Sequence, residues 1–168
     1  MSSTITGVLS EEHLSVFGIS KGETLYHATL LSKGLRIPVV IPERYAKLLG
    51  ERVSLNGFLT STYEDKLFTY FHCNIVEKTE EKDSLEVEVR GHYRKSNVSV
   101  EDDTSERVFK VVKYNPGKTH RVIHITATKK FDEQLDALKH NDSICCVGKI
   151  TTRRGLSVTL TEIRGGNA

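Results

Sequence analysis

Basic and aromatic side chains gather in the second half of the chain, in the residue types that bind a nucleic-acid strand. Arg and Lys suit contacts with phosphate groups, and the planar guanidinium of Arg also stacks on bases. A Tyr ring offers a surface on which a base can stack, at about 1–3 kcal/mol per base. These side chains lie on predicted strands or in the turns beside them, and period-two alternation places Lys149 and Arg153 on the outer phase of their strand. The candidate set is Tyr93, Arg94, Lys95, Arg107, Lys110, Lys113, Tyr114, Lys118, His120, Arg121, Lys149, Arg153 and Arg154.

Within this set, Tyr114 is expected to be the main stacking residue and Tyr93 the second. Phe109 shares its phase with Val111, so it is expected in the core instead. A bulge in a strand would exchange inside and outside locally. The alternative for the whole set is a solvated basic surface with no ligand.

The first half of the chain carries a separate group of aromatic side chains on the outward phase of its predicted strands. Exposed apolar patches occur at protein interfaces as well as at ligand sites. The residues around this group are not basic, which favours an interface, with the second repeat or a partner subunit, over base stacking. The group consists of Phe58, Phe68, Tyr70 and His72.

Net charge differs between the two halves of the chain. The whole chain has 24 Lys and Arg residues against 22 Asp and Glu residues, a net charge of +2. Residues 1–83 contain 9 basic and 11 acidic residues, whereas residues 84–168 contain 15 and 11. The positive second half favours a polyanionic partner there, although an ordinary fluctuation in surface composition would give the same difference.

Alternating apolar and polar residues predict β-strands through most of the chain. The strand-like runs of the first half are ITGVL, ETLYHATLL, GLRIPVVI, ERVSLNGFL and KLFTYFHCNIV. The segment PERYAKLLG has helical character, with Pro42 at its start and Gly50 after its end. The second half has the same order, and KKFDEQLDALKHN is predicted as a helix of about three turns.

The two halves form an internal repeat with a period of roughly 80 to 90 residues. Gly50 and Asn141 each follow the helical segment, and each is expected to make the turn into the fourth strand. Gly57 and Gly148 occupy equivalent positions within that strand, where a small barrel must bend.

Five strands with a helix between the third and fourth is the order of the OB-fold. It predicts a mostly β protein of two tandem five-stranded OB-fold barrels, each with one short helix between strands 3 and 4. We expect the first OB-fold at residues 1–78, a charged linker at 79–84, a second and basic OB-fold at 85–164, and a short tail at 165–168. The alternative is a single larger β-domain with an unrelated topology.

The second half resembles the bacterial single-stranded-DNA-binding proteins, through VEVRG at 87–91, HRVIHI at 120–125 and CVGKITTR at 146–153. The first half is similar to primosomal replication protein N, through GETLYHATL, LRIPVVIPERY, GERVSLNGFLTSTY and KLFTYF in that order. The sequence departs from the family in having no Trp, whereas stacking tryptophans are common there. It also ends in RGGNA, without the acidic tip through which the cellular proteins recruit partners.

This resemblance implies a sequence-nonspecific single-stranded-DNA-binding protein that acts in replication or recombination, or on a mobile genetic element. A homo-oligomer is expected because edge strands and the aromatic group need cover, and replication proteins are possible further partners. Two alternatives stay open. The OB-folds would bind single-stranded RNA, since the fold serves both nucleic acids, or they would bind proteins as a replication adaptor.

Other function classes find no support in the sequence. It has no Gly-rich phosphate loop, zinc-ligand spacing or nucleophile motif, so we expect no catalytic residues, no metal site and no cofactor. The three cysteines are too few and wrongly spaced for a zinc site, and Cys73 and Cys146 are expected in the core. No apolar run approaches the roughly 18 residues of a membrane helix, and the N-terminus lacks a signal-peptide pattern. A cytoplasmic protein without membrane association is expected.

Overall fold

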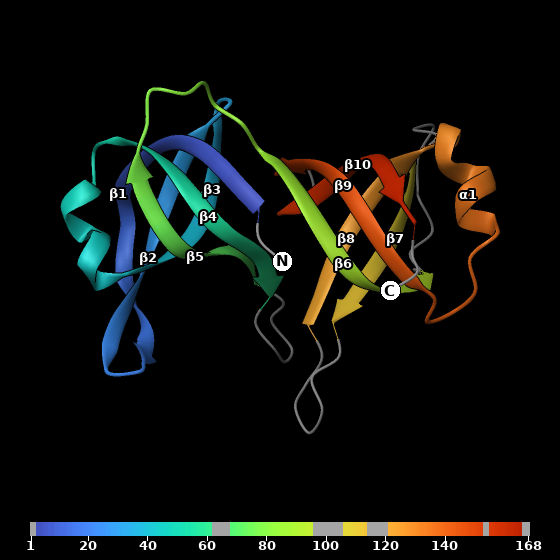
Figure 1. Cartoon of the computed structure of the whole chain (residues 1–168), viewed down its shortest axis with the longest axis horizontal. Coiled ribbons are helices and arrows are strands. Elements are labelled where there is room, and N and C mark those ends of the chain that lie inside the picture. The colour runs from blue at the N-terminus through green and yellow to red at the C-terminus, as the bar shows by residue number, and fades with distance from the viewer. Residues whose placement is uncertain (1–2, 62–67, 96–105, 114–120, 153–154, 166–168) are drawn as a thin grey trace. The chain divides into compact units, whose positions relative to one another are not determined.

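The computed structural model describes residues 3–61, 68–95, 106–113, 121–152 and 155–165, and it contains two closed five-stranded barrels (Figure 1). The described residues divide into two compact units, one with residues 3–60 and 69–87 and the other with Ser61, Phe68 and the residues from Glu88 onward. The strands of the first barrel are β1 (Ser3–Ser20), β2 (Glu23–Ser32), β3 (Leu35–Pro42), β4 (Arg52–Ser61) and β5 (Thr69–Lys78). Those of the second are β6 (Glu86–Lys95), β7 (Glu106–Lys113), β8 (Arg121–Thr128), β9 (Ser143–Thr151) and β10 (Ser157–Arg164).

Both barrels follow the same strand order. The first is ordered β1-β2-β3-β5-β4, and the second is ordered β10-β8-β7-β6-β9, which is the same circular order shifted by five strands. The third and fifth strands of each barrel, β3 with β5 and β8 with β10, pair in parallel. This topology confirms the predicted fold class, a mostly β chain with two tandem OB-fold barrels.

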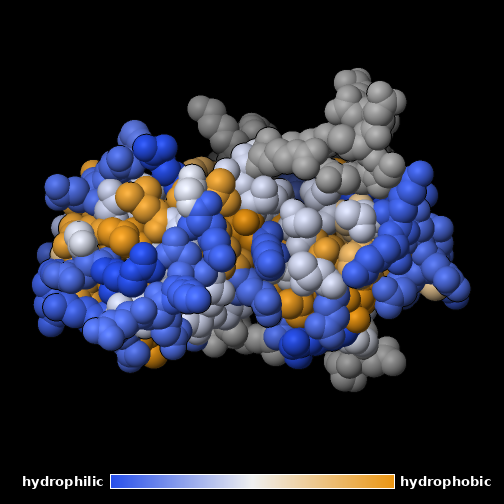
Figure 2. Space-filling view, turned by 90° about the horizontal axis from the view of Figure 1, so that it is seen from above, coloured by the Kyte–Doolittle hydropathy of each residue, from blue (hydrophilic) through white to orange (hydrophobic). Residues whose placement is uncertain are grey.

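The helical segments between the third and fourth strands are shorter than the sequence pattern predicts. The first is a 3₁₀ helix, η1 (Glu43–Leu48), and the second joins η2 (Lys129–Phe131) to α1 (Asp132–Asp136). The amide of Leu138 bonds to the carbonyl of Leu135, a three-residue spacing that tightens the chain and ends the helix early. The outer surface of α1 is hydrophilic, at the right-hand end of Figure 2. No helix in the described part of the chain is long and apolar enough to cross a membrane.

The turns after these helices match the expectation from the repeat. Gly50 has φ +89° and Asn141 has φ +70°, the left-handed conformation that Gly and Asn adopt most readily. Gly57 and Gly148 lie where two strands approach closely. A Cβ on Gly57 would lie 1.8 Å from the carbonyl oxygen of His72, and one on Gly148 would lie 2.3 Å from that of Thr159. Each barrel therefore bends at an equivalent glycine of its fourth strand.

The period-two phase identifies most of the core but fails near the end of β5. The side chains predicted to face inward in β4, β7 and β9 are buried, and so are Phe71 and Cys73 in β5. Ile75, predicted inward, is 47% exposed, and Val76 is buried instead. Asn74 and Ile75 are both exposed, so the alternation slips by one residue after Cys73. The correctly predicted core residues are Val53, Leu55, Leu59, Phe71, Cys73, Phe109 and Cys146.

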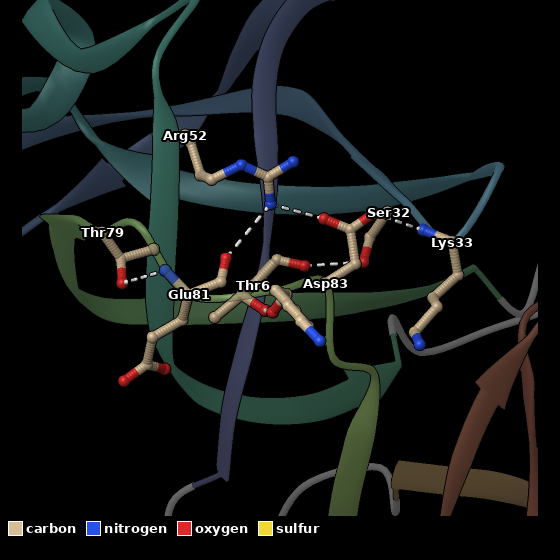
Figure 3. A network of polar contacts seen from close by, with 8 residues as sticks. Thr6, Ser32, Lys33, Arg52, Thr79, Glu81 and Asp83 are labelled. Carbon is tan, nitrogen blue, oxygen red and sulfur yellow. Dashed lines mark hydrogen bonds and ion pairs between the residues drawn. The ribbon is translucent and has the colours of Figure 1, made fainter.

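The charged segment at 79–84 lies along the first barrel and is bound to it (Figure 3). Thr6 of β1 and Ser84 exchange backbone hydrogen bonds of 2.9 and 3.4 Å. The guanidinium of Arg52 lies 2.6 Å from the carboxylate of Asp83, which also accepts the backbone N–H of Lys33 at 2.8 Å.

These contacts fix the segment electrostatically as well as by geometry. The N–H of Lys33 and the guanidinium of Arg52 hold the pKa of the Asp83 carboxyl below its ordinary value. The carboxylate is therefore ionised at neutral pH and anchors the segment to the first barrel.

Candidate nucleic-acid interface

Three basic side chains form a row across the strands of the second barrel. Arg94 of β6 lies opposite Lys110 of β7, and Lys110 lies opposite His124 of β8. Residues directly opposite each other project to the same side of a sheet. Neighbouring strands are about 4.8 Å apart, so this basic row (Arg94, Lys110, His124) spans about 10 Å between its outer strands.

The basic row lies on the outer side of the barrel. The adjacent cross-strand row consists of Tyr93, Val111 and Ile123, which are buried in the core. Side chains alternate between faces along a strand, so the basic row faces away from the core. Its three members are half-buried. Cations at this position can neutralise an anion that lies across β6, β7 and β8.

His124 is the one titratable member of the row near neutral pH. Burial lowers the pKa of His124 below its ordinary value, and the neighbouring Lys110 lowers it further. The imidazole is therefore neutral at pH 7. An anion bound to the row would favour the charged form and raise this pKa. The sequence analysis did not select His124. Its neighbours on the row, Lys110 and Arg94, lie on other strands, and the sequence alone does not show which residues lie opposite one another.

A second cationic pair lies at one end of the barrel. Lys113 of β7 lies opposite Arg121 of β8, two residues beyond the buried pair of Val111 and Ile123 and on the same phase of the strands. Lys113 and Arg121 are both half-buried. Burial, together with the charge of Arg121, lowers the pKa of the Lys113 ammonium. The pair therefore belongs to the end of the β7–β8 hairpin and not to the basic row.

Arg107 has a structural partner. Its guanidinium lies 3.3 Å from a carboxylate oxygen of Asp132 and 2.8 Å from one of Asp136. Both aspartates belong to α1, so Arg107 attaches the helix to β7. Two carboxylates already offset its charge, and we remove it from the candidate interface.

The other predicted basic residues are placed as follows. Lys149 is exposed on β9, opposite Thr159 of β10, and Lys95 is exposed at the end of β6. Neither belongs to the row across β6, β7 and β8. Five predicted residues lie outside the described part of the chain: Tyr114, Lys118, His120, Arg153 and Arg154.

The expectation that Tyr93 is exposed for base stacking is wrong. Its side chain is 3% exposed, and its ring centroid lies 5.4 Å from that of Phe109 in the core. Along β6 the buried phase runs through Val87, Val89 and Tyr93, so the ring points inward. Phe131 is buried as well. The described aromatic residues of the second barrel therefore belong to its core.

The predicted exposure of Tyr70 is also wrong. Tyr70 does project from the side opposite the core residue Phe71, but it is only 4% exposed. It belongs to a small apolar cluster with Leu25 and Val40, against which Phe17 packs. The ring centroids of Phe17 and Tyr70 are 5.2 Å apart. The cause is β1, which continues to Ser20 and brings Phe17 over this side of the barrel.

The remaining members of the aromatic group keep an outward position. Phe58 and His72 are half-buried, with ring centroids 5.2 Å apart and planes inclined at 35°. Phe68 is 40% exposed and lies immediately before β5. Among the described residues, no group of three or more His, Cys, Asp or Glu side chains has the arrangement of a metal site.

Comparison with known proteins identifies the same tandem fold elsewhere. No protein-family model matches the sequence, and no curated protein matches it. The wild-type single-stranded DNA binding protein from Thermus aquaticus superposes with a TM-score of 0.67 and 12% identity, over 99% of this chain and 93% of that chain. A deletion mutant of that protein superposes with a TM-score of 0.73 and 13% identity, over 97% of this chain and 92% of that chain. The chain therefore shares the two-barrel fold of the Thermus protein along nearly its whole length.

Proposed function

We propose that the chain is a sequence-nonspecific single-stranded-DNA-binding protein whose second barrel makes the main contacts. The observation that carries this proposal is the basic row of Arg94, Lys110 and His124. Oligonucleotides commonly bind OB-folds on the face of the second and third strands, which are β7 and β8 here. The row crosses that face, where a phosphate backbone would meet three aligned side chains.

Phosphate contacts supply most of the binding free energy in this proposal. The described aromatic residues of the second barrel are buried, and Tyr114 remains the sequence-based candidate for stacking. Affinity should therefore fall steeply as salt rises, with a slope of about 0.7 per phosphate contact on a single strand. Because phosphates are common to all sequences, discrimination between bases should be small.

The other candidate residues of the second barrel would extend the path of the bound DNA strand. The cellular role that we propose follows from this ligand. We propose OB-fold domains at residues 1–78 and 85–164, joined by the segment at 79–84. A protein of this kind would act where single strands are exposed, in replication or recombination or on a mobile genetic element. The candidates beyond the row are Lys95, Lys113, Tyr114, Lys118, His120, Arg121, Lys149, Arg153 and Arg154.

A protein-interaction role is the second candidate, and it concerns the first barrel. Among the described residues of this barrel, Phe68 is 40% exposed and Phe58 and His72 are half-buried, and no basic row comparable to that of β6–β8 crosses β2, β3 and β5. Such a surface suits a protein partner, such as a replication protein, better than a phosphate backbone. The excess of acidic over basic residues in residues 1–83 also supports this adaptor role over a phosphate ligand.

Fluorescence anisotropy with labelled oligo-dT, oligo-rU and a matched duplex tests the proposal at two salt concentrations. We expect tight binding to oligo-dT, weak binding to the duplex, and loss of affinity with salt. Lys110→Ala should weaken binding about tenfold and lower the salt slope by about one phosphate contact. Lys139→Ala, which removes an exposed cation beyond α1, is the matched control and should bind as the wild type does.

Three outcomes would redirect the proposal. Tighter binding to oligo-rU than to oligo-dT would make RNA the ligand. Equal losses in Lys110→Ala and Lys139→Ala would mean that general charge, and not the row, is responsible. No binding to any oligonucleotide at moderate salt would leave the adaptor role as the function.

A further inference from the structure

The hairpin of β1 and β2 continues past the first barrel as a two-stranded arm, residues 11–24, drawn in blue in Figure 1. Ser20 and Glu23 pair across a two-residue turn. The turn residues Lys21 and Gly22 have φ of +50° and +76°. Positive φ at both positions is the type I′ turn, whose twist matches that of a hairpin. The arm is therefore a regular ribbon set by its turn.

The strand register gathers large apolar side chains on one side of the arm. Val16 lies opposite Tyr26, and Ile19 lies opposite Thr24. Tyr26 and Thr24 are two residues apart and project to the same side of β2. A register shift adds one residue to β1 between the two pairs, so Val16 and Ile19 share that side although they are three residues apart.

This side of the arm is exposed to solvent. Ile19 is 75% exposed, Val16 63% and Leu14, near the base of the arm, 42%. The other side packs inward, where Phe17 contacts His27 and Tyr70 with ring centroids 4.9 and 5.2 Å apart. Proteins usually cover or charge a protruding strand pair, because exposed apolar ribbons associate. An apolar side left bare on such an arm therefore favours association with another surface.

Charges beside the arm are balanced in sign. Glu12 forms an ion pair of 3.1 Å with Arg36, and Glu23 forms one with Arg44. These pairs offset two of the three glutamates in the arm. Two identical arms can therefore approach without strong repulsion between like charges.

We propose that the exposed side of the arm, Leu14, Val16 and Ile19, is the surface through which two copies of this chain associate. Glu11 is exposed at the base of the arm, and Lys21 is exposed at its tip. A two-fold axis near Val16 sets the arms antiparallel, packs the apolar side chains against one another, and brings Glu11 of each copy beside Lys21 of the other. A single arm is therefore complementary to itself in both shape and charge.

The expected dimer is weak. A stable interface buries about 800 Å² per partner, and three apolar side chains supply a few hundred Å² at most. Association through the arm should therefore show a dissociation constant in the micromolar range. It does not depend on the nucleic-acid proposal, because it is measured with no oligonucleotide present.

Sedimentation velocity on the full chain, from submicromolar to hundreds of micromolar, tests the dimer. The wild type should shift from monomer to dimer, and Val16→Lys/Ile19→Lys should stay monomeric throughout. Ile75→Lys, a charge placed on a 47% exposed side chain of β5, is the matched control and should dimerise as the wild type does. Far-UV circular dichroism checks that each variant is folded. A wild type that remains monomeric, or an arm variant that dimerises equally well, would overturn the proposal.

A charge exchange tests the antiparallel arrangement. Glu11→Lys places two lysines together at each end of the paired arms and should weaken the dimer severalfold. Adding Lys21→Glu restores opposite charges and should recover wild-type association. If Glu11→Lys has no effect, or if the double variant is weaker than the single one, the two-fold arrangement is wrong.

Discussion

The two barrels have the same strand order, but the outer sides of their second and third strands differ. In the first barrel, the outer side of β2, β3 and β5 carries Leu25, Val40 and Tyr70, which are buried beneath Phe17 of the chain's own β1. In the second barrel, the outer side of β6, β7 and β8 carries the half-buried basic row. The first of these surfaces is covered by the chain itself, and the second presents basic side chains.

The first strand of each barrel accounts for this difference. β1 has 18 residues and β6 has 10, and the additional length of β1 supplies both Phe17 and the arm. A repeated fold therefore does not imply a repeated function. The length of one strand and the side chains on its extension decide whether the face is covered by the chain itself or left open.

The largest expected effect comes from a feature that the barrels share. Gly57→Ala and Gly148→Ala each place a Cβ against a backbone carbonyl of the neighbouring strand and should cost about 3 kcal/mol of stability. Gly18→Ala, where a Cβ meets nothing within 4 Å, is the control in the arm. Chemical denaturation monitored by circular dichroism measures all three. If either barrel glycine tolerates Ala as Gly18 does, the two barrels do not bend in the same way.

The next effect concerns only the first barrel. Phe17→Ala removes a ring that packs on Tyr70 and should cost about 2 kcal/mol, less than a fully buried Phe, because Phe17 is half-buried. It should also expose Tyr70, seen as increased quenching of tyrosine fluorescence by acrylamide. Affinity for oligo-dT should not change. A large change in that affinity would place DNA on the first barrel.

A smaller effect separates two cations of β7. Arg107→Ala breaks the ion pairs to Asp132 and Asp136 and should cost about 1 kcal/mol of stability, since these groups are partly exposed. Its affinity for oligo-dT should stay within about twofold of the wild type, whereas Lys110→Ala loses about tenfold. If Arg107→Ala binds as poorly as Lys110→Ala, Arg107 belongs to the interface after all.

The smallest effect is a pH dependence of the second barrel. The pKa of His124 lies below its ordinary value in the free protein, and a phosphate on the basic row would raise it. Binding then takes up a proton, so affinity for oligo-dT should rise about threefold as the pH falls from neutral to about 6. His124→Gln should lose this pH dependence of affinity, while His92→Gln on β6, two strands away, should keep it. Equal pH profiles for the wild type and His124→Gln would remove His124 from the interface.

The strands, their order and most of the core could be predicted from the sequence, because period-two alternation reports burial directly. Leu55 and Phe109 follow that rule, and Gly57 and Gly148 mark equivalent bends. The slip at Ile75 could not be predicted, since a shift of one residue leaves no mark in composition.

The candidate site was predictable only in part. The basic composition of β6 and β7 led to candidate residues on these strands, and Lys110 projects from the outer side of β7 as expected. Tyr70 and Tyr93 were misplaced for different reasons: Tyr93 lies on the core phase of β6, whereas Tyr70 faces outward but is covered by Phe17. The row itself depends on cross-strand register, which brings Arg94, Lys110 and His124 together from separate strands and which no local pattern contains.

Hydrogen–deuterium exchange of the full chain with and without oligo-dT tests the central claim most directly. If the second barrel is the binding unit, added oligo-dT should slow exchange in β7 and β8 around Lys110 and His124. Exchange in β2 and β3 of the first barrel should stay unchanged. Protection of β2 and β3 with none in β7 and β8 would contradict the account, because the face covered by Phe17 would then be the one that binds DNA.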